Sequence, residues 1–199
     1  MRPGRWMNAW WMTAILALTT EAVFAQVYGT RPDGKAITEL APASAQTVVL
    51  YFVATDCPVS NRTFPEMRRV REEFAARGVA FRYVYPNLGE SPQGVRRHQA
   101  EFDAAGEALL DDHGVLTRMT HARVPPEAVV LRRTGAQWAT VYEGRVDDRY
   151  VRLGLERPAA QNHFVERVVD EVLAGRAVEP AVGTPVGCAI MRPGETVQR

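Results

Sequence analysis

The stretch TVVLYFVATDCPVS, residues 47–60, decides the architecture that this sequence predicts. Residues 47–54 are an unbroken run of β-branched, aromatic and aliphatic side chains, which is typical of a strand buried on both faces of a sheet. Cys57 follows that run, and Ser60 or Asn61 can cap a helix that begins there. The stretch therefore predicts a central strand that leads directly into a helix, with a cysteine at the junction.

A helical periodicity follows the junction, and a second strand follows the helix. Apolar residues recur at a spacing near 3.6 residues in Phe64, Met67, Val70 and Phe74. Gly78 is expected to end this helix. Residues 79–85, VAFRYVY, are then a second strand, and this alternation of strand and helix favours parallel strands.

The rest of the chain adds helices, a hairpin and a tail. The expected elements are a helix at 93–104, a strand at 107–110, a helix at 115–122, strands at 127–132 and 137–142, and a helix at 158–173. The last two strands are joined through Thr134 and Gly135, which is a hairpin signal. The order predicts an α/β fold in a single domain, with a central mixed β-sheet flanked by helices.

Length and composition fit one globular domain with a tail. The 199 residues are 46% hydrophobic and 24% charged, a balance that argues against a disordered chain. The 24 basic and 23 acidic residues leave a net charge of +1, so no nucleic-acid partner is expected. We expect the folded domain at residues 26–176. Residues 177–199, rich in proline and glycine, are expected to be an extended C-terminal tail that carries Cys188.

Residues 1–25 have the three-part pattern of a secretory signal peptide. Arg2 and Arg5 precede an apolar run at 10–18, and the pattern ends on residues that fit cleavage after Ala25. The alternative is an uncleaved membrane anchor, but the run is shorter than the about 20 residues that a spanning helix needs. We therefore expect an exported protein, periplasmic or secreted, with no stable membrane anchor after cleavage.

Cys57 is the first candidate reactive residue. At a helix N-terminus, unpaired N–H groups and the helix dipole favour the thiolate, which is the nucleophilic form of cysteine. The neighbouring carboxylate of Asp56 opposes this ionisation, and the balance depends on where that side chain points. The alternative interpretation is a buried structural cysteine.

Cys188, in the tail, is the other cysteine of the chain. Outside the cytoplasm Cys57 and Cys188 can remain oxidised as a disulfide. A flexible tail could carry Cys188 to an oxidised Cys57 as a resolving thiol. The competing interpretation is a static disulfide that pins the tail and stabilises the fold by about 2–4 kcal/mol. Both interpretations require that the two cysteines meet.

Several segments resemble the thioredoxin superfamily, whose fold has the predicted order of elements. The strand, Cys57 at the helix start and the later Pro65 are similar to the active-site helix of that superfamily. Val124-Pro125-Pro126 resembles its cis-proline loop, with Pro126 following the cis bond.

More narrowly, four segments are similar to exported peroxiredoxin-like redoxins of the alkyl hydroperoxide reductase/thiol-specific antioxidant type. They are FVATDCPVSNR (52–62), PEA (126–128), GRVDDRY (144–150) and GCAI (187–190). The resemblance extends over roughly residues 45–190. It implies a thiol-dependent oxidoreductase that reduces peroxides or protein disulfides through Cys57, with Cys188 as resolving thiol. It also implies an external thiol electron donor, such as a thioredoxin-like protein or a disulfide reductase, and no cofactor.

The sequence departs from the pattern of these families near Cys57. Ser60 stands where thioredoxins have the second cysteine of Cys-x-x-Cys, so dithiol exchange within that loop is impossible. Typical peroxiredoxins have a threonine three residues before the cysteine. Here Ala54 has that place and Thr55 is the candidate to orient a peroxide. The arginine that peroxiredoxins bring to the thiolate corresponds to Arg145, with Arg62 as a second candidate, and it would lower the thiol pKa.

A binding module is the alternative to an enzyme. Cys57 and Cys188, with a nearby His or Met, could hold a soft ion such as Cu(I) on the same fold. We expect no other metal site, because the four histidines have no i, i+4 pairing. Asp147 and Asp148 are expected to form a salt-bridged turn rather than a cation site.

Overall fold

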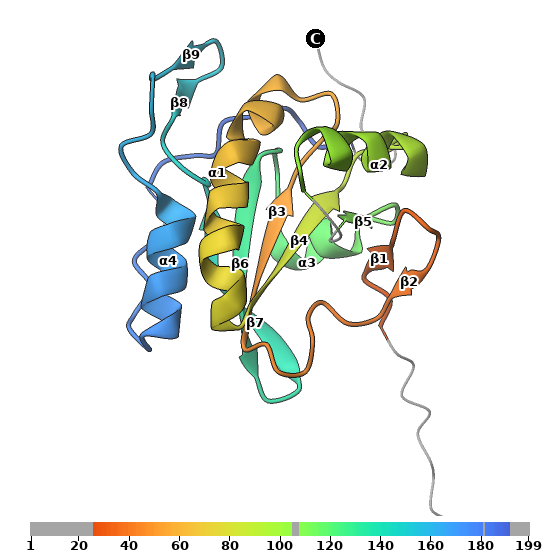
Figure 1. The fold of residues 1–199 in the computed structure, drawn as a ribbon, viewed down its shortest axis with the longest axis vertical. Coiled ribbons are helices and arrows are strands. Elements are labelled where there is room, and N and C mark those ends of the chain that lie inside the picture. Colours follow the sequence, from red (N-terminus) through yellow and green to blue (C-terminus); the bar gives the residue numbers. More distant parts are fainter. Residues whose placement is uncertain (1–25, 105–107, 181, 192–199) are drawn as a thin grey trace, which may run out of the picture.

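The computed structural model describes residues 26–104, 108–180 and 182–191 (Figure 1). The expected signal peptide lies outside the described residues. A seven-stranded sheet forms the centre of the molecule. Its strands are β1 (Gly29–Thr30), β2 (Ala36–Ile37), β3 (Thr47–Phe52), β4 (Val79–Tyr85), β5 (Ala108–Leu110), β6 (Glu127–Thr134) and β7 (Gln137–Gly144).

The strand order across the sheet is β2-β1-β5-β4-β3-β6-β7. β3, β4 and β5 run parallel to one another, while β1, β6 and β7 each pair antiparallel with their neighbours. The central mixed sheet that the sequence predicts is therefore confirmed. β3 lies in its interior, between β4 and β6.

Helices cover both faces of the sheet. They are α1 (Pro58–Phe74), α2 (Pro92–Glu101), α3 (Val115–Thr120) and α4 (Phe164–Leu173), and the short 3-10 turn η1 (Ala75–Arg77) extends the first of them. α1 and α4 lie side by side on one face, and α3 lies behind the sheet in the view of Figure 1. The end of the first helix is as predicted, because Gly78 has the left-handed backbone (φ 82°) that favours glycine.

The alternation of side chains along β3 places its residues in two hydrophobic cores. Val49 and Tyr51 join the core under α1 and α4, while Val48 and Leu50 join the core on the other face. All six residues of β3 are buried, which explains why the strand lacks an alternating polar face. Burial of each large side chain contributes about 1.5–3 kcal/mol, so the strand that leads to Cys57 is firmly held.

The chain after β7 differs from the prediction. The last helix begins at Phe164 and not at residue 158. A small hairpin that the sequence did not predict, β8 (Tyr150–Arg152) with β9 (Leu155–Glu156), projects beside the start of α1 (Figure 1). The later start of α4 has a physical reason. The carboxylate of Asp148 accepts the backbone amides of Gln161 and Asn162, and these two bonds hold the residues before Phe164 out of a helix.

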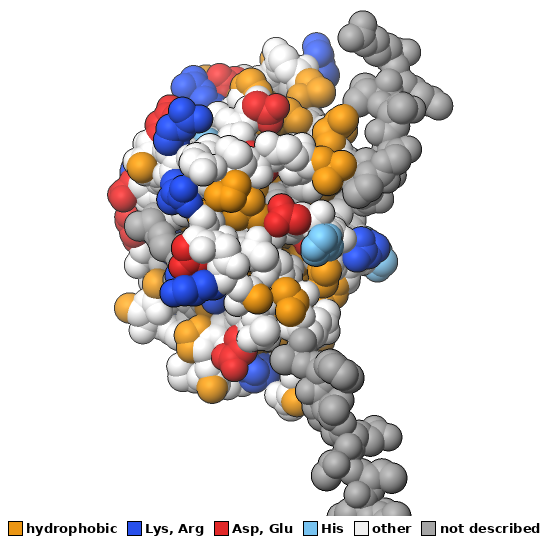
Figure 2. Space-filling model, turned by 90° about the vertical axis from the view of Figure 1, so that its right-hand side faces the viewer, with side chains coloured by type: hydrophobic (Ala, Val, Ile, Leu, Met, Phe, Trp, Pro, Cys, Tyr) orange, Lys and Arg blue, Asp and Glu red, His pale blue; other side chains and the backbone are white. Residues whose placement is uncertain are grey.

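The tail returns across the body of the molecule. Val178 packs against the core under α1 and α4, while Pro185 and Ile190 are buried further along. None of the helices in the described part of the chain has the length and apolar character needed to cross a membrane. On the face seen in Figure 2, basic and acidic side chains are interspersed among apolar ones.

Candidate functional site

Cys57 is the N-cap residue of α1, and its side chain is completely buried. The prediction that Ser60 or Asn61 caps this helix is wrong, because the helix begins at Pro58 and both residues lie inside it. Proline favours the first helical position, where it loses no hydrogen bond and its φ is already helical. Ser60 is buried in the first turn, and its Oγ accepts the amide of Ala54 at 3.4 Å. The sulfur of Cys57 therefore lies at the helix N-terminus.

The Asp56 side chain, whose direction the sequence left open, is exposed to solvent. Solvent screens the interaction of a carboxylate with a nearby charge. The positive end of α1 favours negative charge on the buried sulfur of Cys57, and the exposure of Asp56 weakens the opposing effect of its carboxylate.

The Pro125–Pro126 peptide bond is cis, as the resemblance to the cis-proline loop implies. The carbonyl oxygen of Pro125 lies 3.3 Å from the Cys57 sulfur. The loop is fixed by the buried carboxylate of Glu127, which accepts the amides of Arg123 and Val124 at 2.7 and 3.3 Å. Burial raises the pKa of Glu127.

Cys57 and Cys188 form a disulfide across a sequence separation of 131 residues. Their Cα atoms are 6.1 Å apart, within the usual range for a disulfide. The amide of Cys188 donates to the carbonyl oxygen of Pro125 at 2.9 Å. The structure thus brings together three parts of the chain at one point: the start of α1, the cis-proline loop and the tail.

Arg145 contacts the tail. Its Nε donates to the carbonyl oxygen of Thr184 at 2.6 Å, and its Nη1 donates to that of Tyr150 at 3.3 Å. A cavity of about 20 Å³ lies beside it, lined also by Val59 and Pro126. A cavity of that size has room for about one water molecule. Arg62, the second candidate arginine, forms an exposed ion pair with Glu156.

The hydroxyl of Thr55 is already used by another side chain. Both the amide and Oγ1 of Thr55 donate to the carboxylate of Glu90, at 3.0 and 2.7 Å. This pair of bonds fixes the loop between β3 and Cys57. It also uses the only donor hydrogen of the hydroxyl, so that Thr55 Oγ1 could meet a peroxide only as an acceptor while this bond is made.

A buried polar chain beneath this loop was not predicted from the sequence. Asn61 Nδ2 donates to the carbonyl of Thr55 at 3.3 Å, and its Oδ1 lies 2.8 Å from His98 Nε2. The ring therefore donates at Nε2, and Nδ1 accepts from the Tyr85 hydroxyl at 2.9 Å. His98 shares the buried face of α2 with Val95, and that spacing was the available signal.

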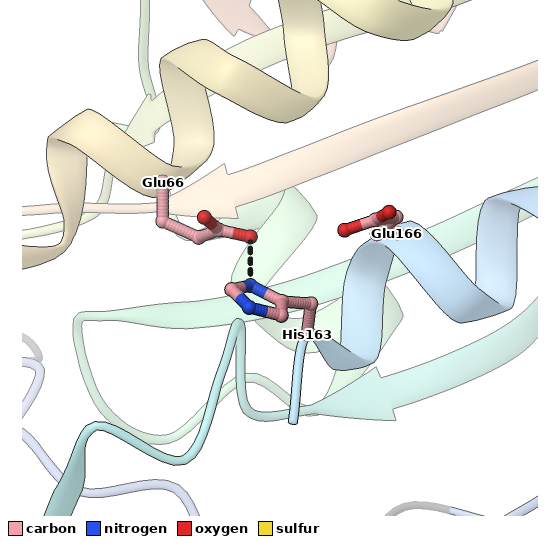
Figure 3. Close-up of side chains that lie close together, drawn as sticks. All are labelled: Glu66, His163 and Glu166. Carbon is pink, nitrogen blue, oxygen red and sulfur yellow. Dashed lines mark hydrogen bonds and ion pairs between the residues drawn. The ribbon is translucent and has the colours of Figure 1, made fainter. Parts of the chain in front are cut away.

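Glu66, His163 and Glu166 have ligand atoms within 4.8 Å of one another (Figure 3). His163 Nδ1 lies 2.8 Å from a carboxylate oxygen of Glu66. Arg69 already bridges the carboxylates of Glu66 and Glu166, so its guanidinium supplies the positive charge at this cluster. Asp148 forms the salt-bridged turn, since it pairs with Arg157.

Comparison with family models shows the family of this chain. Residues 25–135, more than half of the chain, match the model of the AhpC/TSA family. The chain belongs to the AhpC/TSA family. It is a redoxin of the thioredoxin superfamily. The comparison with curated proteins finds no match.

Solved structures support the thioredoxin-like fold. An uncharacterized conserved protein from Geobacillus kaustophilus has a TM-score of 0.71 at 21% identity, covering 86% of this chain and 92% of its own. A hypothetical protein from Sinorhizobium meliloti 1021 has a TM-score of 0.70 at 16% identity, covering 88% and 97%. A thiol:disulfide interchange protein of the thioredoxin family from Chlorobium tepidum has a TM-score of 0.50 at 18% identity, covering 73% and 91%. The predicted α/β thioredoxin-like fold is confirmed.

Proposed function

We propose that this AhpC/TSA-family protein is an exported oxidoreductase that exchanges its Cys57–Cys188 disulfide with the thiols or disulfides of other proteins. The observation that carries the proposal is the position of the disulfide. One sulfur lies at the N-terminus of α1, and the other belongs to an extended segment that is hydrogen-bonded to the cis-proline loop through Pro125. A segment of the protein's own tail therefore already lies against the cis-proline loop and Cys57.

Reduction of peroxides is the second candidate, and membership of the AhpC/TSA family favours it. Three observations support protein disulfides instead. The Thr55 hydroxyl donates its hydrogen to Glu90, Cys57 is completely buried, and the neighbouring cavity has room for about one water molecule. A peroxide would have to reach the reduced sulfur beneath the tail.

The proposed cycle needs an external electron donor. A dithiol donor reduces the Cys57–Cys188 disulfide by two electrons and is itself oxidised to a disulfide. The reduced pair then passes the two electrons to an oxidised substrate protein. A thioredoxin-like protein or a disulfide reductase has the chemistry that the donor requires.

A redox titration of the full chain against dithiothreitol or glutathione tests this function. We expect a midpoint potential above about −300 mV, because structural disulfides of secreted proteins lie below that value. The reduced protein should also reduce insulin disulfides, and Cys57→Ser and Cys188→Ser should each abolish this activity. A midpoint well below that limit, without insulin reduction, would identify a static disulfide.

Two further assays separate the other candidates. Rapid consumption of hydrogen peroxide that requires Cys57, without insulin reduction, would establish the peroxidase. Tight stoichiometric binding of Cu(I) by the reduced protein, without either activity, would establish the copper carrier, because Cu(I) prefers soft sulfur ligands.

Export is supported by the sequence pattern of residues 1–25 and by a disulfide, which persists in oxidising compartments. Cell fractionation and N-terminal sequencing test it. We expect the mature chain outside the cytoplasm, beginning at Gln26. A cytoplasmic protein that retains Met1 would contradict export.

A further inference from the structure

The two cysteines of the disulfide differ in how deeply each residue is buried. Cys57 is completely buried, whereas Cys188 is half-buried and is followed by the exposed Ala189. Ala54 and Val59 pack around Cys57, and the carbonyl oxygen of Pro125 lies 3.3 Å from its sulfur. A molecule that approaches from outside therefore meets Cys188 first.

The segment that carries Cys188 is also held on both sides by contacts that do not depend on the disulfide. Before it, the Thr184 carbonyl accepts the Nε of Arg145 at 2.6 Å. After it, Ile190 is buried in the core that contains Val48 and Leu50, on the face of the sheet away from α1 and α4. The Met191 amide donates to Asn87 Oδ1 at 3.0 Å. Reduction of the disulfide removes none of these contacts. We therefore expect the segment to stay over Cys57 in the reduced protein.

The two sulfurs also differ as leaving groups. In thiol–disulfide exchange the sulfur that is not attacked leaves as a thiolate, and a thiol of lower pKa leaves faster. Cys57 is the N-cap residue of α1, where the helix dipole and the free backbone N–H groups stabilise negative charge. Cys188 lies in a segment without regular secondary structure. Attack at Cys188 therefore releases the better leaving group.

We propose that Cys188 is the sulfur through which this protein forms mixed disulfides with its redox partners, and that Cys57 is the internal thiol. This assignment rests on the proposed function. It reverses the roles that the family resemblance implies, in which Cys57 attacks and Cys188 resolves.

The exchange with a dithiol donor runs in two steps. A donor thiolate attacks Cys188 Sγ, so that a donor–Cys188 bond forms, the Cys57–Cys188 bond breaks, and the electron pair of that bond remains on Cys57 as thiolate. The second donor thiolate then attacks the donor sulfur of the mixed disulfide. The donor disulfide forms, and Cys188 is released as a thiolate that takes a proton from water. The protein has gained two electrons and the donor has lost them.

With an oxidised substrate the same steps run in reverse. The Cys188 thiolate attacks the substrate disulfide and forms a mixed disulfide, and one substrate thiolate leaves. The Cys57 thiolate then attacks Cys188 Sγ, restores the internal disulfide and releases the second substrate thiolate.

Trapping of the mixed disulfide with glutathione tests the assignment. The oxidised full chain is incubated with glutathione and quenched with excess N-ethylmaleimide, and peptide mass spectrometry locates both adducts. We expect glutathione on Cys188 and N-ethylmaleimide on Cys57, with at least a tenfold excess over the opposite pattern. A majority of glutathione on Cys57 overturns the assignment and leaves the proposed function intact. Absence of any glutathione adduct overturns both.

Single-cysteine variants give an independent measurement with oxidised glutathione. We expect Cys188 in Cys57→Ser to be glutathionylated at least tenfold faster than Cys57 in Cys188→Ser. Equal or reversed rates overturn the assignment. Adding Ile190→Ala to Cys188→Ser should accelerate the reaction of Cys57, because this change loosens the segment that covers it, whereas Ala189→Ser should leave the rate unchanged. Circular dichroism verifies that each variant is folded, and the wild-type trapping decides the question if a variant is not.

Discussion

Gly187 lies directly against the carbonyl oxygen of Pro125: a Cβ placed on Gly187 would stand 1.9 Å from that oxygen. The glycine is therefore required by close approach of two backbones. The neighbouring amide of Cys188 donates to the same oxygen at 2.9 Å. The Pro125 carbonyl thus sets the position of the tail and of its sulfur.

Substitution of this glycine should displace the tail. We expect Gly187→Ala to destabilise the oxidised protein by about 1–3 kcal/mol, because the added methyl group has no space without a backbone shift. Denaturant unfolding and the fraction of protein with an intact disulfide are the measurements. Ala189→Ser, at an exposed neighbouring site, is the control and should change stability by less than about 0.5 kcal/mol. Equal stability of the two variants would contradict the close contact.

Reduction of the disulfide should destabilise the fold without unfolding it. The Cys57–Cys188 bond closes a long loop, and we expect its loss to cost about 2–4 kcal/mol. The buried Ile190 and the hydrogen bond from Arg145 to Thr184 remain, so the reduced protein should keep its native circular dichroism. Urea unfolding of the oxidised and reduced wild type measures the difference. A reduced protein that is unfolded in buffer would show that the tail depends on the disulfide alone.

Arg145 should affect the accessibility of Cys57 by holding the tail. We expect Arg145→Ala to speed alkylation of Cys57 in the reduced protein several-fold, because the carbonyls of Thr184 and Tyr150 lose their donor. An arginine that stabilises the thiolate would have the opposite effect, since its removal raises the thiol pKa and slows alkylation. Iodoacetamide kinetics across a range of pH distinguish the two roles. Arg62→Ala, which removes an exposed arginine, is the matched control.

Glu90 should stabilise the loop before Cys57. It accepts two hydrogen bonds from Thr55, and bonds to a charged partner contribute about 1.5–3 kcal/mol. We expect Glu90→Ala to lower the free energy of unfolding by about 1–3 kcal/mol and Thr55→Val to lower it less, because only one of the two bonds is lost. Thr55→Ser retains the hydroxyl and serves as the control. An unchanged midpoint of urea unfolding in Glu90→Ala would refute this role.

His98 should make the stability of the fold depend on pH. Burial lowers its pKa below the ordinary value of 6.5, so the unfolded chain binds a proton more readily than the folded one. The contribution of His98 to stability is therefore complete above about pH 6.5 and decreases as the pH falls below that value. Protonation at Nδ1 also removes the acceptor for the Tyr85 hydroxyl.

Thermal unfolding between pH 4.5 and 7.5 measures this effect. We expect His98→Gln to be less stable than wild type at pH 7.5 and to lose less stability on acidification. His113→Gln, at an exposed histidine, should keep the wild-type pH profile. The role of His98 would be excluded if its variant and wild type had parallel profiles.

Local sequence was sufficient for the central elements. The run at residues 47–54 predicted a strand buried on both faces, and the 3.6-residue spacing after it predicted α1, because both signals arise within a single element. Together the two signals predicted that Cys57 lies at the start of α1. The cap itself was predicted incorrectly, since Pro58 begins the helix before Ser60.

Relationships across the chain were decided only by the tertiary structure. Nothing local to Thr55 indicates that Glu90 binds its hydroxyl, and nothing local to Gly187 indicates that Pro125 lies against it. The burial of Cys57 and the partial exposure of Cys188 likewise depend on how the tail packs over the sheet. The sequence by itself determined the fold and the cysteine pair, because hydrophobic periodicity and residue type are local properties. The structure decided which groups surround each sulfur, because those neighbours come from distant segments that only packing brings together.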